Sequence, residues 1–136
     1  MDLKYSGRLT RATDGSAGLD VYSSEDATLV PTQIRLVRTG LHLEIPKGHV
    51  GLLCSRSGLA ADLHLVVLND PGVIDSDYRG EIQVLLRNYS SRPYSVQSGD
   101  RIAQLVILKT PNLKLSETDT SSMSLTERGE KGFGST

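Results

Sequence analysis

Apolar and polar residues alternate with a period of two along several stretches of the chain, as expected for half-buried β-strands. Such stretches cover 34–36 and 41–45, which end at a Pro-Lys-Gly turn, and 50–54. Short apolar runs bounded by turn residues follow at 65–68, 82–86 and 102–108. Many short strands at this spacing predict an all-β sandwich or barrel.

Helix is a minor component of this pattern. Only residues 57–64 are compatible with a short helical turn, and the sequence contains no heptad or solenoid repeat. From Lys109 onward the chain becomes polar, and residues 128–136 are glycine-rich without apolar periodicity. We expect a β domain over residues 1–127, followed by an extended C-terminal arm, 128–136, that is mobile when alone.

Length and composition limit the size of the core. A chain of 136 residues is long enough for one domain and short for two of ordinary size. Hydrophobic residues make up 38% of it, with one Phe, five Tyr and no Trp, so aliphatic side chains must form most of the core. We expect a modest core that association between chains extends.

The distribution of charge excludes several classes of partner. The net charge is −1, and acidic and basic residues are interspersed, so polymeric nucleic acid is not expected as a main partner. The N-terminus lacks the pattern of a secretory signal, and no apolar stretch reaches membrane-spanning length. We expect a soluble intracellular protein, located in the cytoplasm, or in the nucleus if its source is eukaryotic or viral, with no membrane partner.

Histidine and cysteine do not form a metal-binding pattern. His42, His49 and His64 show no close pairing, and Cys54 is the only cysteine, which also rules out an intramolecular disulfide. Carboxylates are therefore the better candidates for chemistry.

Two segments have the composition of phosphate-binding loops. Residues 55–58 place Arg56 between serines after a predicted strand, although an ordinary polar turn has the same composition. The arm ends in Gly-Phe-Gly-Ser-Thr, where Gly134 occupies the position at which a Walker loop requires lysine. Its glycine-rich backbone can still wrap phosphate oxygens, and a disordered tail is the alternative.

The segment 72–82 carries the densest set of reactive side chains. Asp75, Asp77, Tyr78, Arg79 and Glu81 follow an apolar pair and precede a predicted strand. A carboxylate at a strand end can act as a general base for water, and a tyrosine three positions later can pack on a sugar. A solvated charged hairpin explains the same pattern equally well.

Taken in order, five segments resemble the five motifs of the trimeric dUTP pyrophosphatase (dUTPase) family, and together they cover the chain from end to end. These segments are 17–21, 56–60, 72–82, 99–105 and 128–136. The resemblance implies a jelly-roll β fold in a homotrimer whose three active sites are shared between subunits. It also implies that the C-terminal arm closes over a site as a lid.

The activity implied by the resemblance is Mg²⁺-dependent hydrolysis of dUTP to dUMP and pyrophosphate. This activity limits uracil incorporation into DNA and supplies dUMP for thymidylate synthesis. Asp75 resembles the general base that deprotonates a water for in-line attack on the α-phosphorus. Tyr78 resembles the residue under the deoxyribose, where its ring leaves no room for a 2′-hydroxyl. The positions that resemble the uracil-reading hairpin are Asn69, Val73, Ile74 and Gln83.

The remaining motifs resemble the parts of the family's site that bind the triphosphate. Arg56, Ser57 and Gly58 look like the phosphate-binding motif, with Ser57 near the bridging oxygens. Asp20 and Gln104 match positions that hold waters of a magnesium ion coordinated by the substrate.

In the arm, Phe133 resembles the aromatic residue that stacks on uracil, and Arg128 resembles the residue that pairs with the γ-phosphate. Further contacts are implied for Gly132, Gly134 and Ser135.

The sequence departs from the family pattern in small ways and leaves two alternatives. Ser55 stands where the family often has proline, and the sequence ends at Thr136, where many relatives continue. The dCTP deaminases share the fold, but the motif at 75–78 and the arm match the pyrophosphatases more closely. A binding or signalling module with a protein partner, switched by the nucleotide-dependent lid, is the other alternative.

Overall fold

The computed structural model describes residues 1–134 of the chain. The β-strands are β1 (Lys4–Ser6), β2 (Leu9–Arg11), β3 (Leu19–Tyr22), β4 (Ala27–Leu29), β5 (Ile34–Glu44), β6 (His49–Cys54), β7 (Leu65–Val67), β8 (Gly72–Ile74), β9 (Ile82–Asn88), β10 (Tyr94–Val96) and β11 (Arg101–Lys109). Helical structure within residues 1–134 consists of α1 (Ser57–Leu63) and the 3-10 turn η1 (Thr120–Ser122). None of these helices is long and apolar enough to cross a membrane.

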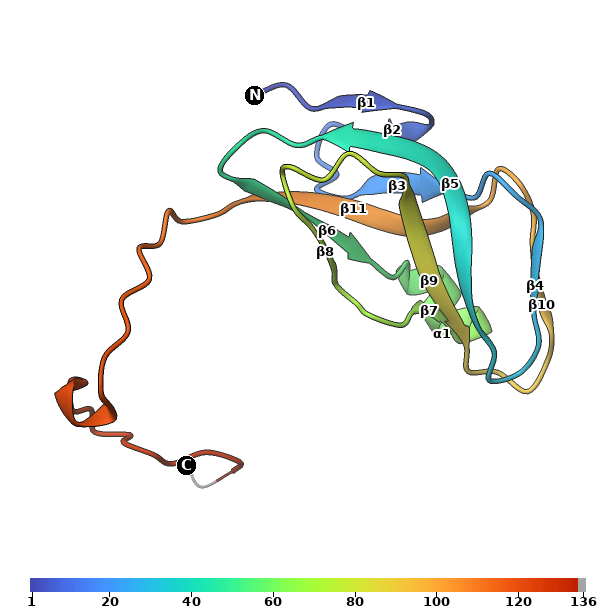
Figure 1. The fold of residues 1–136 in the computed structure, drawn as a ribbon. Helices are drawn as coiled ribbons and strands as arrows, with labels where there is room; N and C mark the ends of the chain where they lie inside the picture. Colours follow the sequence, from blue (N-terminus) through green and yellow to red (C-terminus); the bar gives the residue numbers. More distant parts are fainter. Residues whose placement is uncertain (135–136) are drawn as a thin grey trace.

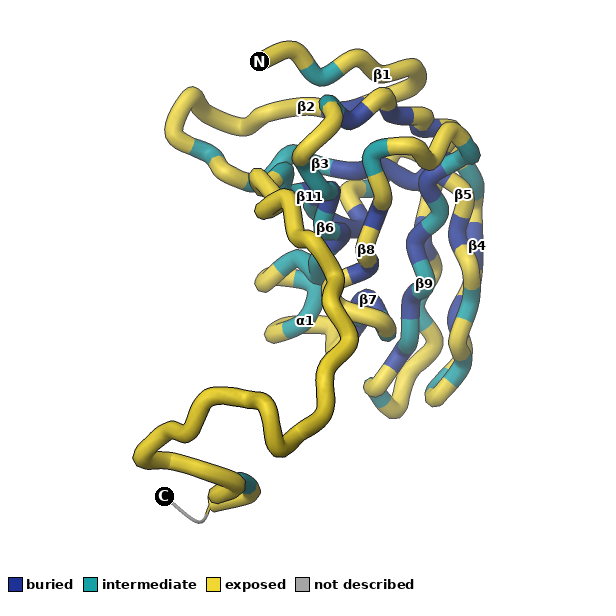
Figure 2. Tube along the Cα trace, turned by 60° about the vertical axis from the view of Figure 1, so that its left-hand side comes forward, coloured by how far each residue is buried: buried dark blue, intermediate teal, exposed yellow. Residues whose placement is uncertain are grey.

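The strands form antiparallel sheets that enclose the core (Figure 1). One sheet has the order β2-β3-β11-β6-β8, a second has the order β1-β5-β9-β7, and β10 pairs with β4. The core is aliphatic, as the composition predicted, and includes Val84 and Leu86 of β9 and Leu105 of β11, all fully buried (Figure 2). The prediction of an all-β, jelly-roll-like fold is confirmed.

The two alternating stretches at 34–36 and 41–45 largely belong to one long strand, β5. Its odd-numbered residues from Val37 to Leu43 are buried, whereas Ile34 and Leu36 lie on the outer face with exposed fractions of 47% and 52%. The period-two pattern therefore identified the strand but not which of its faces meets the core, because either face of a strand can carry apolar residues.

A bulge interrupts the pairing of β5 with β9. Arg38 is the partner of Gln83 and Leu41 is the partner of Ile82, so two residues of β5 have no partner on β9. Gly40 lies within this bulge with φ of 64°, a left-handed conformation that glycine adopts without steric cost.

The predicted strands at 50–54, 65–68, 82–86 and 102–108 correspond to β6, β7, β9 and β11, and the predicted helical turn corresponds to α1. The sequence pattern missed β1, β2, β3, β4 and β10 as strands. Each has only three or four residues, too few for a period of two to stand out.

After β11 the chain leaves the sheets and continues as an extended segment that leads into the arm, drawn in orange and red in Figure 1. Thr110 is still tied to the sheets, since its N–H donates to the carbonyl of Gly48 at 2.8 Å. Beyond Thr110 this segment and the arm run away from the sheets, and their described residues are almost wholly exposed (Figure 2).

Candidate functional site

A cavity of about 260 Å³ lies where the segment 72–82 crosses from one sheet to the other. β8 pairs with β6 through Val73 and Leu52, and the chain then enters β9 in the neighbouring sheet at Ile82. The cavity is lined by Leu53, Asn69, Gly72, Val73, Ile74, Asp75, Tyr78, Glu81, Ile82 and Gln83. The structure thus brings together the predicted general base, the predicted sugar-contacting tyrosine and the predicted uracil-reading positions.

Asp75 directly follows β8, and its carboxylate is open to solvent. Its carbonyl oxygen accepts a hydrogen bond from the N–H of Tyr78 at 3.2 Å, which closes a turn. A second, wider groove adjoins the cavity, shares Val73 and Asp75 with it, and carries cationic and anionic side chains together, among them Lys47, Arg79 and Asp77. The exposed Asp75 is therefore accessible to water from this groove as well.

The ring of Tyr78 is held in one orientation against the wall of the cavity. Its hydroxyl donates a hydrogen bond to the carbonyl oxygen of Glu81 at 3.0 Å, and 47% of the residue is exposed. Gly80 makes room for the ring, because a Cβ at that position would collide with the phenol. The exposed part of the ring is available to a ligand.

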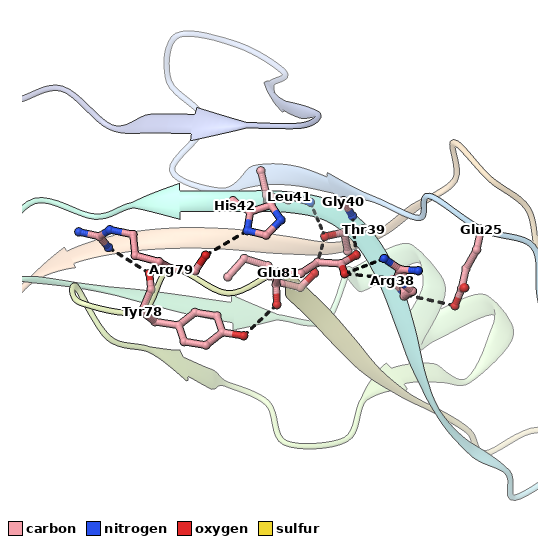
Figure 3. A network of polar contacts seen from close by, with 10 residues as sticks. Glu25, Arg38, Thr39, Gly40, Leu41, His42, Tyr78, Arg79 and Glu81 are labelled. Carbon is pink, nitrogen blue, oxygen red and sulfur yellow. Dashed lines mark hydrogen bonds and ion pairs between the residues drawn. The ribbon is translucent and has the colours of Figure 1, made fainter.

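Glu81 lines the cavity, but the sequence assigned it no role. Its Oε1 accepts a hydrogen bond from the N–H of Gly40 at 2.9 Å, and its Oε2 accepts one from Nε of Arg38 at 3.2 Å (Figure 3). The Gly40 N–H lowers the pKa of Glu81 most strongly; burial opposes this shift and the Arg38 guanidinium adds to it. The sequence shows a carboxylate before β9 but not its partners, which lie about forty positions away.

Asp20, Arg56 and Gln104 form a second group outside the cavity. Gln104 of β11 is paired with Asp20 of β3 and with Cys54 of β6, which places their side chains in one row on one face of the sheet. Nε of Arg56 lies 3.5 Å from Oδ1 of Asp20, and NH1 of Arg101 lies 3.6 Å from Oδ2.

The phosphate-binding candidates Ser57 and Gly58 lie beside this group, exposed in the first turn of α1. The Nε2 group of Gln104 donates to the carbonyl of Ser55 at 2.9 Å, which ties β11 to the segment that leads into α1.

The donor atoms of this second group suit a hard cation that receives most of its ligands elsewhere. No group of three or more His, Cys, Asp or Glu side chains within residues 1–134 could hold a metal by itself. Asp20 and Gln104 offer oxygen atoms, and Mg²⁺ is commonly held through waters and substrate phosphates. Burial raises the pKa of the Cys54 thiol, and Asp70 adds to the effect, so the protonated form of the thiol is favoured.

The arm holds its predicted residues away from both groups (Figure 1). Phe133 is fully exposed, and Nε of Arg128 donates to the carbonyl of Lys131 at 2.9 Å. Gly132 is half-buried and Gly134 is exposed, whereas Ser135 lies outside the described residues.

The chain is similar to known dUTPases in both sequence and structure. The sequence model described as dUTPase matches residues 4–136. Deoxyuridine 5'-triphosphate nucleotidohydrolase from Anaplasma marginale is 50% identical over 127 residues, which cover 92% of this chain and 85% of that protein. A mutant dUTPase of phage 80alpha superposes with a TM-score of 0.90 at 30% identity, covering 99% of this chain and 98% of the other.

A mutant dUTPase from phage phi11 of S. aureus, whose structure is described as revealing the coordination of a structural Mg(II) ion, superposes with a TM-score of 0.82 at 26% identity. That match covers 90% of this chain and 100% of the other. With the family's sequence model matched over residues 4–136 and a relative 50% identical over most of both chains, this protein belongs to the dUTPase family.

Proposed function

We propose that this protein hydrolyses dUTP to dUMP and pyrophosphate. The observation that carries the proposal is the single cavity that Asp75 shares with Tyr78 and with the base-reading positions. In one ligand, the carboxylate suits a reacting phosphate, the aromatic ring suits a sugar, and the backbone and amide groups suit a nucleobase.

Asp75 acts as the general base in this proposal. It accepts a proton from a water molecule, whose oxygen forms a bond to the α-phosphorus while the bond from that phosphorus to the bridging oxygen breaks. Pyrophosphate leaves with the bridging oxygen, and dUMP gains the oxygen of the water. The position of Asp75 at the end of β8, open to solvent, supports this role.

Tyr78 and the base-reading positions select the substrate. The exposed face of the Tyr78 ring packs under the deoxyribose and excludes a 2′-hydroxyl by contact. Uracil is read by the remaining lining groups, which would clash with a 5-methyl group and present the wrong hydrogen-bond pattern to cytosine. The proposed base-reading residues are Asn69, Val73, Ile74 and Gln83.

Arg56, Ser57 and Gly58 bind the triphosphate, and Arg128 pairs with its γ-phosphate. Asp20 and Gln104 would hold waters of a Mg²⁺ ion bound mainly through the substrate phosphates, a role that their side-chain oxygen atoms suit. When bound, Mg²⁺ neutralises charge on the triphosphate during phosphoryl transfer.

We also propose that the protein acts as a homotrimer with shared sites. Neither Arg56 nor Asp20 lines the Asp75 cavity of its own chain, so a complete site requires the two groups to meet. The outer faces of the sheets carry exposed apolar side chains suited to association, including Ile34 at 47%, Leu36 at 52% and Leu108 at 47%.

Residues 128–136 are the proposed lid. Phe133 stacks on uracil, and Gly132, Gly134 and Ser135 add contacts when the arm folds over a site. The extended course of the arm supports this role, since it leaves Arg128 and Phe133 exposed. The activity would limit uracil incorporation into DNA and supply dUMP for thymidylate synthesis.

The test is to incubate the protein with dUTP and Mg²⁺ and to measure pyrophosphate release. We expect release from the unmodified protein and from an Asp14→Asn control, whose carboxylate lies in an exposed loop. Asp75→Asn should abolish release while calorimetry still detects binding of a non-hydrolysable dUTP analogue. Absence of release from the unmodified protein, or release of ammonia from dCTP instead, would overturn the proposal.

A further inference from the structure

The bulge in β5 leaves backbone groups that β9 does not pair. Gly40 lies between the register positions of Arg38 and Leu41, so its N–H points at no carbonyl of the neighbouring strand. The carboxylate of Glu81 accepts this N–H at 2.9 Å. A side chain from the segment 72–82 therefore replaces the missing strand pairing.

Other groups of the bulge bind the same short segment. The Thr39 hydroxyl donates to the carbonyl of Ile82 and accepts the N–H of Leu41 at 3.0 Å. One strand position further on, Nδ1 of His42 lies 3.0 Å from the carbonyl oxygen of Arg79 (Figure 3). The bulge and its neighbour thus hold residues 79–82 at several points.

Arg38 fixes the second oxygen of the Glu81 carboxylate. Its Nε and NH2 atoms both lie 3.2 Å from Oε2 of Glu81. The backbone N–H of Arg38 donates to Oε1 of Glu25 at 3.2 Å. The Glu81 side chain is only 16% exposed. Both carboxylate oxygens therefore have partners on β5, which hold the Glu81 side chain against the bulge.

The backbone of Glu81 acts on the opposite side, toward the cavity. Its carbonyl oxygen accepts the Tyr78 hydroxyl at 3.0 Å, while its side chain is tied to the bulge. The position of the Tyr78 ring thus depends on where the bulge holds Glu81.

We propose that Glu81 is a positioning residue that sets selectivity for deoxyribose, by anchoring the backbone acceptor of the Tyr78 hydroxyl to the β5 bulge. This inference rests on the proposed function, because the ring is assigned there to the sugar. The Tyr78 hydroxyl is bound to the Glu81 carbonyl, and the missing side chain of Gly80 leaves the space that the phenol fills. Loss of the anchor lets the ring move away from the space that a 2′-hydroxyl would occupy.

The experiment compares Glu81→Ala, Glu81→Gln and Tyr78→Phe with the unmodified protein, using kcat/KM for dUTP and for UTP. Glu81→Ala should lower the dUTP-to-UTP ratio of kcat/KM by about tenfold or more. Glu81→Gln should have a smaller effect, because the amide oxygen still accepts the Gly40 N–H. Tyr78→Phe keeps the aromatic ring but removes its hydrogen bond to the Glu81 carbonyl. It should therefore lower the dUTP-to-UTP ratio even though Glu81 itself is unchanged.

Glu44→Gln is the matched control. Glu44 is the last residue of β5 and, like Glu81, pairs with a cation, Lys4 at 3.2 Å, but this pair is exposed and Glu44 does not line the cavity that contains Tyr78. The dUTP-to-UTP ratio of kcat/KM for Glu44→Gln should equal that of the unmodified protein. Thermal unfolding of every variant shows which are folded, and Glu81→Gln and Tyr78→Phe carry the test if Glu81→Ala does not fold.

The outcomes separate this inference from the proposed function. If the unmodified protein hydrolyses dUTP but the folded Glu81 variants lose kcat with an unchanged dUTP-to-UTP ratio, the positioning role is wrong while the proposed function stands. If the unmodified protein releases no pyrophosphate, the proposed function fails. In that case binding of dUMP and UMP to the same variants tests sugar selectivity, and an unchanged affinity ratio would overturn the inference.

Discussion

Nε of Arg56 lies 3.5 Å from Oδ1 of Asp20, so the proposed phosphate-binding cation directly contacts the carboxylate proposed to hold the waters of a metal. Arg101 approaches the other oxygen of the same carboxylate at 3.6 Å. The Asp20 side chain is only 15% exposed, and the two guanidinium groups balance its charge. Asp20 thus connects the proposed phosphate-binding residue, the proposed metal site and the stability of the sheet.

Asp20→Asn should lower the free energy of unfolding by about 1 kcal/mol, because it removes the partner of two partly exposed cations. It should also raise the Mg²⁺ concentration that gives half-maximal activity. Chemical denaturation and a magnesium titration measure the two effects. Asp14→Asn, in an exposed loop, should change neither. Unchanged magnesium dependence in Asp20→Asn would contradict the role given to this carboxylate.

Mixing two inactive variants tests whether the sites are shared. Asp75→Asn and Arg56→Ala should each be inactive alone. If Asp75 and Arg56 of one site come from different subunits of a trimer, random reassembly should restore about a quarter of the sites. Pyrophosphate release after joint refolding measures this recovery, and light scattering measures the mass. If the mixture reassembles into trimers but recovers no pyrophosphate release, Asp75 and Arg56 of one site come from the same chain.

Closure of the arm should protect it from proteolysis. Arg128 and Lys131 are exposed, so trypsin should cleave there quickly in the free protein. Saturation with Mg²⁺ and a non-hydrolysable dUTP analogue should slow this cleavage by about tenfold or more, since cleavage then follows the population of the open arm. Mass spectrometry over time identifies the cut sites, and the analogue of UTP serves as the control. Equal cleavage with and without the dUTP analogue would argue against a lid.

Stability should depend on pH through Glu81. The Gly40 N–H, opposed by burial and assisted by Arg38, lowers the pKa of Glu81 in the folded protein. The carboxylate therefore stabilises the fold fully above the pKa of glutamate in the unfolded chain, about 4.3, and this contribution is lost as the pH falls through the lower folded pKa. The difference in unfolding free energy between the unmodified protein and Glu81→Gln should shrink over that range. A difference that does not change with pH would show that the charge of Glu81 contributes nothing.

Gly80→Ala should displace the Tyr78 ring. A Cβ at position 80 would overlap the phenol, which the aromatic ring cannot avoid by a small local shift. We expect KM for dUTP to rise by about tenfold, since displacement of a substrate-positioning group has effects of this size. Gly15→Ala is the control, because a Cβ there meets nothing within 4 Å. Steady-state kinetics measures KM for dUTP, and circular dichroism verifies that both variants are folded. Equal KM values for the two variants would refute this account.

The sequence alone predicted the strands that are long enough to show their periodicity. β6, β9 and β11 fall where apolar residues alternate or cluster, and the motif at 72–82 places most of the cavity within a short stretch of chain. Asn69 and Gln83, which flank that stretch, were assigned from the resemblance to the uracil-reading hairpin of the family, and both line the cavity. Local information therefore supported both the β architecture and the family.

The tertiary structure decided the contacts between residues far apart in the chain. The row formed by Asp20, Gln104 and Cys54 exists only because β3, β11 and β6 are neighbours in one sheet. The role of Glu81 depends on a bulge whose residues precede it by about forty positions, and no periodic pattern records that pairing. Alternation along a strand reports which residues share a face, whereas the identity of the neighbouring strand is determined by the packing of the whole chain.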